Sequence, residues 1–210
     1  KIMKKLFLTL AAMTIAFSAV ADEGMWLLPL IEKMNGKAIK ELGCELTPKQ
    51  IYDINNTSLK DAIVQFGGGC TGEIISSEGL LVTNHHCGYS NIQKLSSVEH
   101  DYLKNGYWAM NNSEELPCEG LTVKFLESMT DVTSVIEKAQ KKGEEAVNKA
   151  IADLEKEAEQ ANPHCTAVVT SFYDTNVYYL IVYKVYSDVR FVGAPPSSIG
   201  KFGADTDNWM

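Results

Sequence analysis

The chain has 210 residues and a formal net charge of −8 at pH 7, with 27 acidic against 19 basic side chains. This acidic balance argues against nucleic acid as a partner, because binding phosphates needs a basic face. The length suits one domain, or part of a larger one.

The first 21 residues predict a secretory signal peptide. Three lysines form a basic end, Leu6–Phe17 forms a short apolar core, and Ala19-Val20-Ala21 supplies a cleavage site of small residues. An apolar run of about a dozen residues is short for a membrane span, so we expect cleavage rather than anchoring. The mature chain would begin at Asp22, lose the three lysines and keep 16 basic side chains, and be exported without a membrane span.

The first half of the mature chain combines short helices with a β-hairpin. Residues 25–42 have an amphipathic helical pattern with a break near Pro29, and Thr47 followed by Pro48 marks the start of a second helix. Residues 70–86 contain two β-prone runs, separated by Ser-Ser-Glu-Gly with its turn chemistry. We therefore expect an antiparallel hairpin over this stretch.

The second half predicts further strands and one charged helix. A strand begins at Leu121, and the charged, alanine-rich Ser134–Ala161 predicts a solvated surface helix with Gly143 as an interruption. Two strands rich in Val, Tyr and Ile follow from Cys165, joined by a turn at 174–176. The fold class expected from this order is mainly β with inserted helices.

The last stretch, residues 194–210, is a loop rich in Gly, Pro and Ser. Ser197 and Ser198 follow two prolines, but no elbow pattern of a nucleophile surrounds them. Since Met210 closes no predicted element, we expect the chain to be the front piece of a longer protein.

The segment 67–89, GGGCTGEIISSEGLLVTNHHCGY, places His85 and His86 directly before Cys87, at the end of the second predicted strand. Side chains adjacent on a strand point to opposite faces, so the two imidazoles could not easily share an ion, and we predict no metal site. A second interpretation is a histidine that is only hydrogen-bonded. A third is the general base of a serine peptidase, held within reach of a serine hydroxyl and oriented by a carboxylate.

Five cysteines lie in the exported part, where an oxidising compartment makes disulfides the default expectation: Cys44, Cys70, Cys87, Cys118 and Cys165. Cys70 and Cys87 flank the predicted hairpin, which can bring their Cα atoms to the roughly 5–6 Å that a bridge needs. A second bridge between Cys118 and Cys165 stays open, because connectivity cannot be deduced from sequence. Cys44 would then be a buried free thiol.

Five motifs in order carry a resemblance to a known family: DEGMW, GGGCTGEIISSEGLLVTNHHCGY, DYLKNGYWA, ELPCEGLTV and VRFVGAPPSSIGKFGADTDNW. Together they resemble the bacterial dipeptidyl-peptidases of serine peptidase family 46, over nearly all of residues 22–210. The resemblance implies a chymotrypsin-like double β-barrel peptidase, of which this chain would hold the N-terminal part and most of the first barrel. The second barrel half and the family's large helical domain would lie outside it.

The resemblance also implies catalytic roles. It places the catalytic histidine at His86 rather than His85, in agreement with strand alternation, and it implies a disulfide between Cys70 and Cys87 that anchors this base. The aspartate of the Ser-His-Asp triad would follow shortly after Met210, and the serine much later. Both would therefore be missing from this chain.

The resemblance further implies peptide substrates with a free N-terminus. Asn208 and Trp209 would hold the substrate's α-amino group, where an aromatic face beside a cation adds roughly 0.5–2 kcal/mol. No metal or organic cofactor is implied, and the family's tendency to dimerise makes a homodimer a candidate for the full-length form. The protein would work in the periplasm or on the outer surface of a Gram-negative bacterium.

The function expected from these observations is an exported serine dipeptidyl-peptidase in which His86 takes a proton from the serine hydroxyl. The chain alone would be inactive, because the nucleophile is absent. An alternative is a secreted, non-catalytic binding module on a peptidase-like barrel. A weaker alternative is a metal-binding protein that uses His85, His86 and cysteines, which an intact Cys70–Cys87 bridge would exclude.

Overall fold

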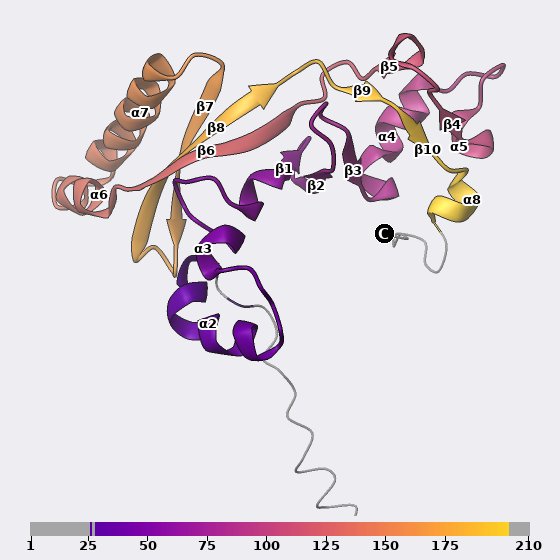
Figure 1. Ribbon diagram of the computed structural model, residues 1–210. Coiled ribbons are helices and arrows are strands. Elements are labelled where there is room, and N and C mark those ends of the chain that lie inside the picture. Colours follow the sequence, from indigo (N-terminus) through magenta and orange to yellow (C-terminus); the bar gives the residue numbers. More distant parts are fainter. Residues whose placement is uncertain (1–25, 27, 202–210) are drawn as a thin grey trace, which may run out of the picture. The chain divides into compact units, whose positions relative to one another are not determined.

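The computed structural model describes residue 26 and residues 28–201 of the chain. The expectations for the signal peptide at 1–21 and for Asn208 and Trp209 therefore lie outside the described residues. Two compact units divide the chain, one within residues 1–48 and one within residues 49–210 (Figure 1).

The first unit contains a short amphipathic helix. A 3-10 helix, η1 (Leu28–Leu30), includes Pro29 and leads into helix α2 (Ile31–Glu41). Ile31 and Ile39 of α2 are buried, as expected for two side chains eight residues apart on one helix face. The predicted helix with a break near Pro29 is confirmed.

An antiparallel sheet of six strands forms the centre of the second unit. Its strands are β1 (Ile63–Phe66), β2 (Cys70–Ile74), β3 (Leu81–Thr83), β6 (Val123–Asp131), β7 (Cys165–Phe172) and β8 (Val177–Tyr186). They lie in the order β3-β2-β1-β6-β8-β7. The mainly β fold class is confirmed, but the described strands form an open sheet with β3 and β7 at its edges, and they do not close into a barrel.

Short strand pairs and further helices make up the rest of the described chain, with α3 beginning at the last residue of the first unit. Strand β4 (Tyr107–Trp108) pairs with β10 (Gly193–Ala194), and β5 (Leu116–Pro117) pairs with β9 (Arg190–Phe191). The helices are α3 (Pro48–Ile51, beginning at the predicted proline), η2 (Leu59–Ala62), α4 (His85–Leu95), α5 (Tyr102–Asn105), η3 (Asn112–Glu114), α6 (Thr133–Gln140), α7 (Glu144–Ala161) and α8 (Ser197–Gly200). None of the helices within residues 28–201 is both long and apolar enough to cross a membrane.

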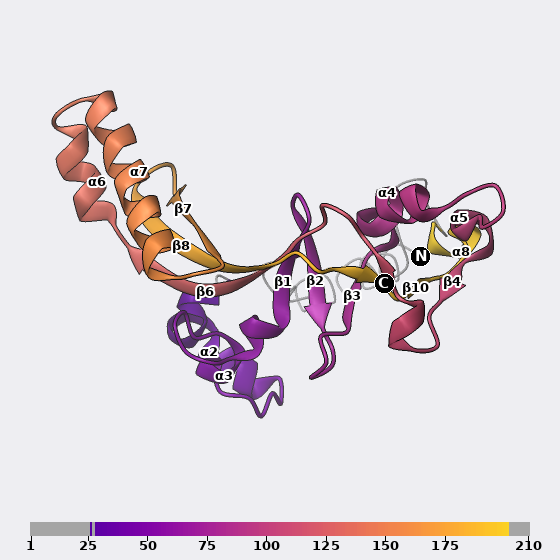
Figure 2. The ribbon, with the colours of Figure 1, turned by 90° about the horizontal axis from the view of Figure 1, so that it is seen from above.

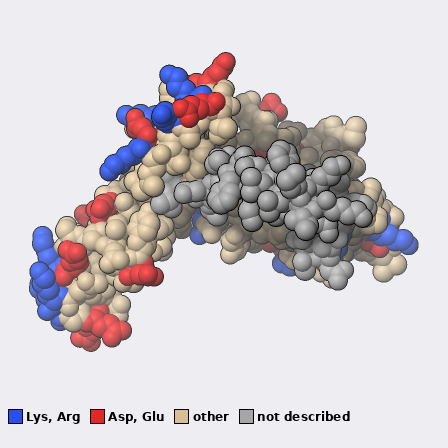
Figure 3. All heavy atoms as spheres, turned by 90° about the horizontal axis from the view of Figure 1, so that it is seen from below, with Lys and Arg blue, Asp and Glu red and all other residues tan. Residues whose placement is uncertain are grey.

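The charged segment at 134–161 folds as two helices. Gly143, at a φ of 104°, separates α6 from α7, so the predicted interruption is confirmed. Both helices lie beside β7 and β8 (Figure 2), and charged side chains of both signs gather over them (Figure 3). The inner face of α6 is not solvated, because Ile136 is completely buried there.

Two carboxylates of α7 shield the edge of the sheet. The backbone N–H of Val169 donates to Glu155 Oε1 at 2.9 Å, and that of Ala167 donates to Glu159 Oε1 at 3.0 Å. Both donors belong to β7, an edge strand whose outward N–H groups would otherwise pair with a strand of another chain. Helix α7 is a surface helix without buried residues, as expected, and these two side chains in addition contact the strand.

The core of the second unit lies under β1 and β2. Val64 and Phe66 alternate along β1 and are buried in a cluster that also contains Cys118, Leu121 and Val123. The partly buried side chains packed against this cluster include Cys70, Leu81 and Cys87. The start of β2 and the first turn of α4 are thus held against one core.

Candidate functional site

The two adjacent histidines open a helix instead of ending a strand. Strand β3 ends at Thr83, Asn84 is the extended residue before the helix, and His85 is the first residue of α4. Successive side chains of a helix are rotated by about 100°. The expectation of a strand end is wrong, and strand alternation cannot be what separates His85 from His86.

A disulfide ties the first turn of α4 to the sheet. Cys70, the first residue of β2, is bonded to Cys87, the third residue of α4, with Cα atoms 6.0 Å apart. The bridge therefore joins a strand to a helix, although the pairing is the one expected from the sequence. In the chain-entropy description, closing a loop of this length stabilises the fold by about 3 kcal/mol.

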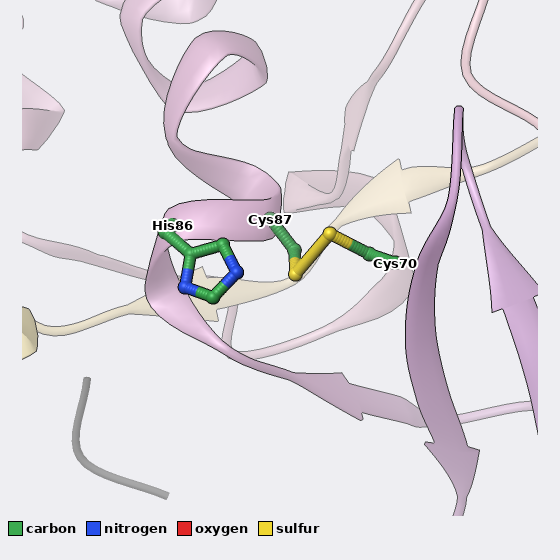
Figure 4. Close-up of side chains that lie close together, drawn as sticks. All are labelled: Cys70, His86 and Cys87. Atoms are coloured by element: carbon green, nitrogen blue, oxygen red, sulfur yellow. A yellow bond between two sulfur atoms is a disulfide. The ribbon is translucent and has the colours of Figure 1, made fainter. Parts of the chain in front are cut away.

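His86 is exposed and lies beside this bridge (Figure 4). It lines a surface hollow of about 410 Å³ together with both bridged cysteines and six further residues: Gly69, Thr71, Glu73, Val82, Thr83 and Asn84. Two of these residues are joined directly, because the hydroxyl of Thr83 donates to the carbonyl of Thr71 at 2.6 Å. An accessible imidazole on an anchored helix start can accept a proton from a hydroxyl that approaches from the hollow.

His85 points elsewhere and packs against α8. Its Nε2 lies 3.3 Å from Ser197 Oγ, and its ring meets the ring of Tyr89 edge-on at 6.0 Å between centroids. A Cβ on Gly200 would lie 2.5 Å from the imidazole, so the ring sits directly on the glycine backbone. Partial burial lowers the pKa of His85, and the nearby charge of Lys201 lowers it further.

The contacts of His85 join α4 to the segment that follows the last sheet strands. Lys201, the residue after α8, extends its Nζ over the Tyr89 ring of α4, 4.2 Å from the centroid, which adds a second link between α4 and this segment. The sequence offered Ser197 only as a poor nucleophile candidate, and nothing local to it points to a histidine 112 residues away. These partners emerge only from the fold.

The possible second disulfide, between Cys118 and Cys165, does not form in the structure. Cys118 and Cys165 are both free thiols, as is Cys44, which is half-buried rather than buried. Cys165 faces Lys184 in the β7–β8 register, whereas the N–H of Cys118 donates to the carbonyl of Val189. Lys184 and Val189 are five residues apart, and an extended chain of this length spans roughly 15 Å. The two cysteines beside them are therefore farther apart than the Cα separation that a disulfide allows. Burial in the core raises the pKa of the Cys118 thiol.

Among the described residues, one group of side chains has the donor types and spacing for a metal ion. The ligand atoms of Cys70, His86 and Cys87 all lie within 4.8 Å of one another. His85 is not part of this group, because it is turned toward Ser197. In the bridged state both sulfurs are bonded to each other, which excludes the metal-binding alternative in its simple form.

Comparison with known proteins places these features in a family context. Residues 21–210 match the family Peptidase S46. The chain is 51% identical to "Dipeptidyl-peptidase 7" of Phocaeicola vulgatus, over 99% of this chain and 31% of that protein. It is 45% identical to the "Asp/Glu-specific dipeptidyl-peptidase" of Porphyromonas gingivalis, over 99% of this chain and 30% of that protein. The chain thus spans less than a third of the length of these relatives.

A solved structure also has this fold. Crystalline DPP11 of Porphyromonas endodontalis, in complex with the dipeptide Arg-Glu, superimposes with a TM-score of 0.78 at 44% sequence identity. The match covers 90% of this chain and 28% of that chain. The open sheet with its helices is therefore the arrangement of one part of a larger structure of this kind.

Proposed function

Because the chain belongs to the peptidase S46 family, we propose that it forms the N-terminal part of an exported serine dipeptidyl-peptidase whose general base is His86. The observation that carries this proposal is the position of His86. Its imidazole is exposed on the first turn of α4, beside a disulfide that fixes this turn to β2, and it faces a hollow. A base in this setting is held firmly and remains accessible to a nucleophile.

The proposed chemistry uses His86 twice. The imidazole takes the proton of a serine hydroxyl as this oxygen attacks the scissile carbonyl, and it then returns the proton to the leaving amine. A carboxylate orients the ring, and backbone N–H groups stabilise the oxyanion. The serine, the carboxylate and these N–H groups are proposed to belong to parts of the protein outside the described residues.

The proposed substrates are peptides with a free N-terminus, from which dipeptides are released. Two curated relatives with 45–51% identity carry names for dipeptide release, one of them specifying Asp or Glu. Asn208 and Trp209 are proposed to hold the α-amino group, which lets the enzyme measure two residues from the chain end. Similarity to relatives of both names supports dipeptide release in general and no particular dipeptide.

The test is turnover of dipeptidyl-coumarin substrates by the full-length protein and its His86→Ala variant. We expect activity in the wild type, its loss in the variant, and no cleavage when the substrate's amino group is acetylated. His100→Ala, an exposed histidine outside the site, is the matched control and should retain activity. We also expect residues 22–210 alone to be inactive. A folded full-length protein that binds peptides without cleaving them would instead indicate the non-catalytic binding module.

A further inference from the structure

We propose that Cys70, His86 and Cys87 form a zinc site when the disulfide is reduced. The donor atoms of these three side chains lie within 4.8 Å of one another. In a tetrahedral site with Zn–S distances of about 2.3 Å and Zn–N distances of about 2.0–2.1 Å, neighbouring donors lie roughly 3.5–3.8 Å apart. After cleavage of the S–S bond, rotation of the two cysteine side chains would let the sulfurs separate to this spacing.

The donor set is of the type that zinc selects. Two thiolates and one imidazole are soft and borderline ligands that favour Zn²⁺ over the hard cations Mg²⁺ and Ca²⁺. Three protein ligands leave the fourth position to water. The exposed His86 and the adjoining hollow of about 410 Å³ provide room for this water and an entry path for the ion.

The elements that carry the three ligands also contact one another through the sheet and a shared core. Cys70 begins β2, which pairs with β1 and β3, and Cys87 lies in the first turn of α4. Both cysteines pack against the buried cluster around Val64 and Phe66. Reduction therefore frees two sulfurs whose Cα atoms, 6.0 Å apart in the bridged state, remain anchored to a common core.

The disulfide and the zinc site exclude each other. A phosphine reductant attacks one sulfur and breaks the S–S bond, and water then converts the phosphine to its oxide while both sulfurs become thiols. Binding of Zn²⁺ displaces the two thiol protons. A low-molecular-weight disulfide can then take two electrons from the thiolates, leaving as two thiols while the Cys70–Cys87 bond re-forms and the ion is released. Other cysteines of the second unit do not replace the pair, because Cys118 is buried in the core and Cys165 lies at the start of β7.

Zinc at this position would also occupy the imidazole that catalysis requires. This consequence rests on the proposed function, whereas the metal site itself does not. A zinc-loaded, reduced enzyme would be inactive, and formation of the disulfide would release the base for catalysis. The oxidation state of Cys70 and Cys87 would then determine whether the enzyme is blocked by zinc or active.

The test uses the full-length protein after reduction with a phosphine. The phosphine is then removed under oxygen-free conditions. Dialysis against Zn²⁺ and metal analysis should find about one ion per reduced chain that is absent from the oxidised chain. Co²⁺ should give the thiolate charge-transfer and tetrahedral d–d bands. Cys87→Ser and His86→Gln should lose or weaken this binding, while the matched controls Cys165→Ser and His85→Gln should keep it. Equal zinc uptake by Cys87→Ser, or none by the reduced wild type, would overturn the proposal.

Folding and activity readouts separate the remaining outcomes. If reduction unfolds the protein, zinc added beforehand should preserve the far-ultraviolet circular dichroism of the wild type but not of Cys87→Ser, and failure to do so also contradicts the site. Reduction-dependent zinc binding by a protein that never cleaves dipeptidyl substrates would refute the proposed function and leave the metal site standing. An active enzyme that binds no zinc after reduction would refute the metal site and leave the proposed function standing.

Discussion

Replacing Gly200 by alanine should destabilise the second unit through His85, against the usual effect of this substitution. Gly200 ends α8 and does not have a positive φ, so alanine is allowed by the backbone. In such a position alanine normally stabilises a protein by about 0.4–1 kcal/mol, because it restricts the unfolded chain. Here the new Cβ would lie 2.5 Å from Cγ and Nδ1 of His85. Non-bonded carbons prefer roughly 3.5–4.0 Å, so the ring must move by about 1 Å.

The magnitude follows from what the displaced ring loses. Overpacking of this kind costs about 1–3 kcal/mol, and a ring that leaves Ser197 also loses a hydrogen bond that contributes about 0.5–1.5 kcal/mol. The two losses overlap, because a single movement of the ring causes both. After the stabilising backbone effect is subtracted, we expect the free energy of unfolding to fall by about 1–3 kcal/mol.

A double-mutant cycle in the full-length protein, measured by urea unfolding, tests this origin. With His85→Ala in place, alanine at 200 meets no ring and should be neutral or stabilising by up to about 1 kcal/mol. Gly88→Ala in α4 is the matched control, since its Cβ would lie 3.9 Å from Ile92 Cδ1, an ordinary contact, and it should stabilise. A Gly200→Ala variant that is as stable as Gly88→Ala, or whose effect is the same with and without His85, would show that the ring is not the cause.

Three further predictions follow from contacts in the second unit. The pKa of His85 is lowered in the folded state, so the folded chain binds fewer protons than the unfolded chain. The contribution of His85 to stability should therefore be fully present above about pH 6.5 and fall as the pH drops toward the folded pKa. Thermal unfolding between pH 8 and 5 should show a smaller loss of stability for His85→Gln than for the wild type. In oxidised protein, Cys87→Ser should lower the free energy of unfolding by about 3 kcal/mol, whereas Cys165→Ser should change it by less than about 0.5 kcal/mol. Equal urea-unfolding midpoints for these two variants would contradict a stabilising role of the bridge. Glu155→Ala should cost about 0.5–1.5 kcal/mol and increase self-association seen by light scattering, because β7 loses an edge contact, while the exposed Glu157→Ala should do neither.

Several elements could be predicted from the sequence because their causes are local. The break at Gly143 follows from the conformational freedom of glycine between two helical patterns, and the hairpin turn expected at 174–176 lies at 173–176, where Tyr173, Asp174 and Thr175 adopt positive φ. The Cys70–Cys87 pairing was expected from the family resemblance, and the hairpin between the two cysteines is compatible with it.

The sequence leaves open whether His85 and His86 continue a strand or begin a helix. The β-prone run before them predicts a strand through His86, but the sheet ladder ends at Thr83 and the chain turns into α4. In a helix the disulfide, rather than strand alternation, is what holds His86 in place. The expectation that His85 and His86 face different surroundings stands, with a different physical reason.

Motifs, their spacing and local propensities were therefore sufficient to identify the fold class, the family and the residue types of the site. Which distant groups meet depends instead on the three-dimensional fold. The strand pairings place Cys118 beside Val189 and Cys165 beside Lys184. The packing of α8 against α4 supplies Ser197 and Gly200 as the partners of His85, and the disulfide contact between β2 and α4 places His86 near two sulfurs. Such contacts depend on how whole elements pack across a core, and local propensities and spacing carry no information about that packing.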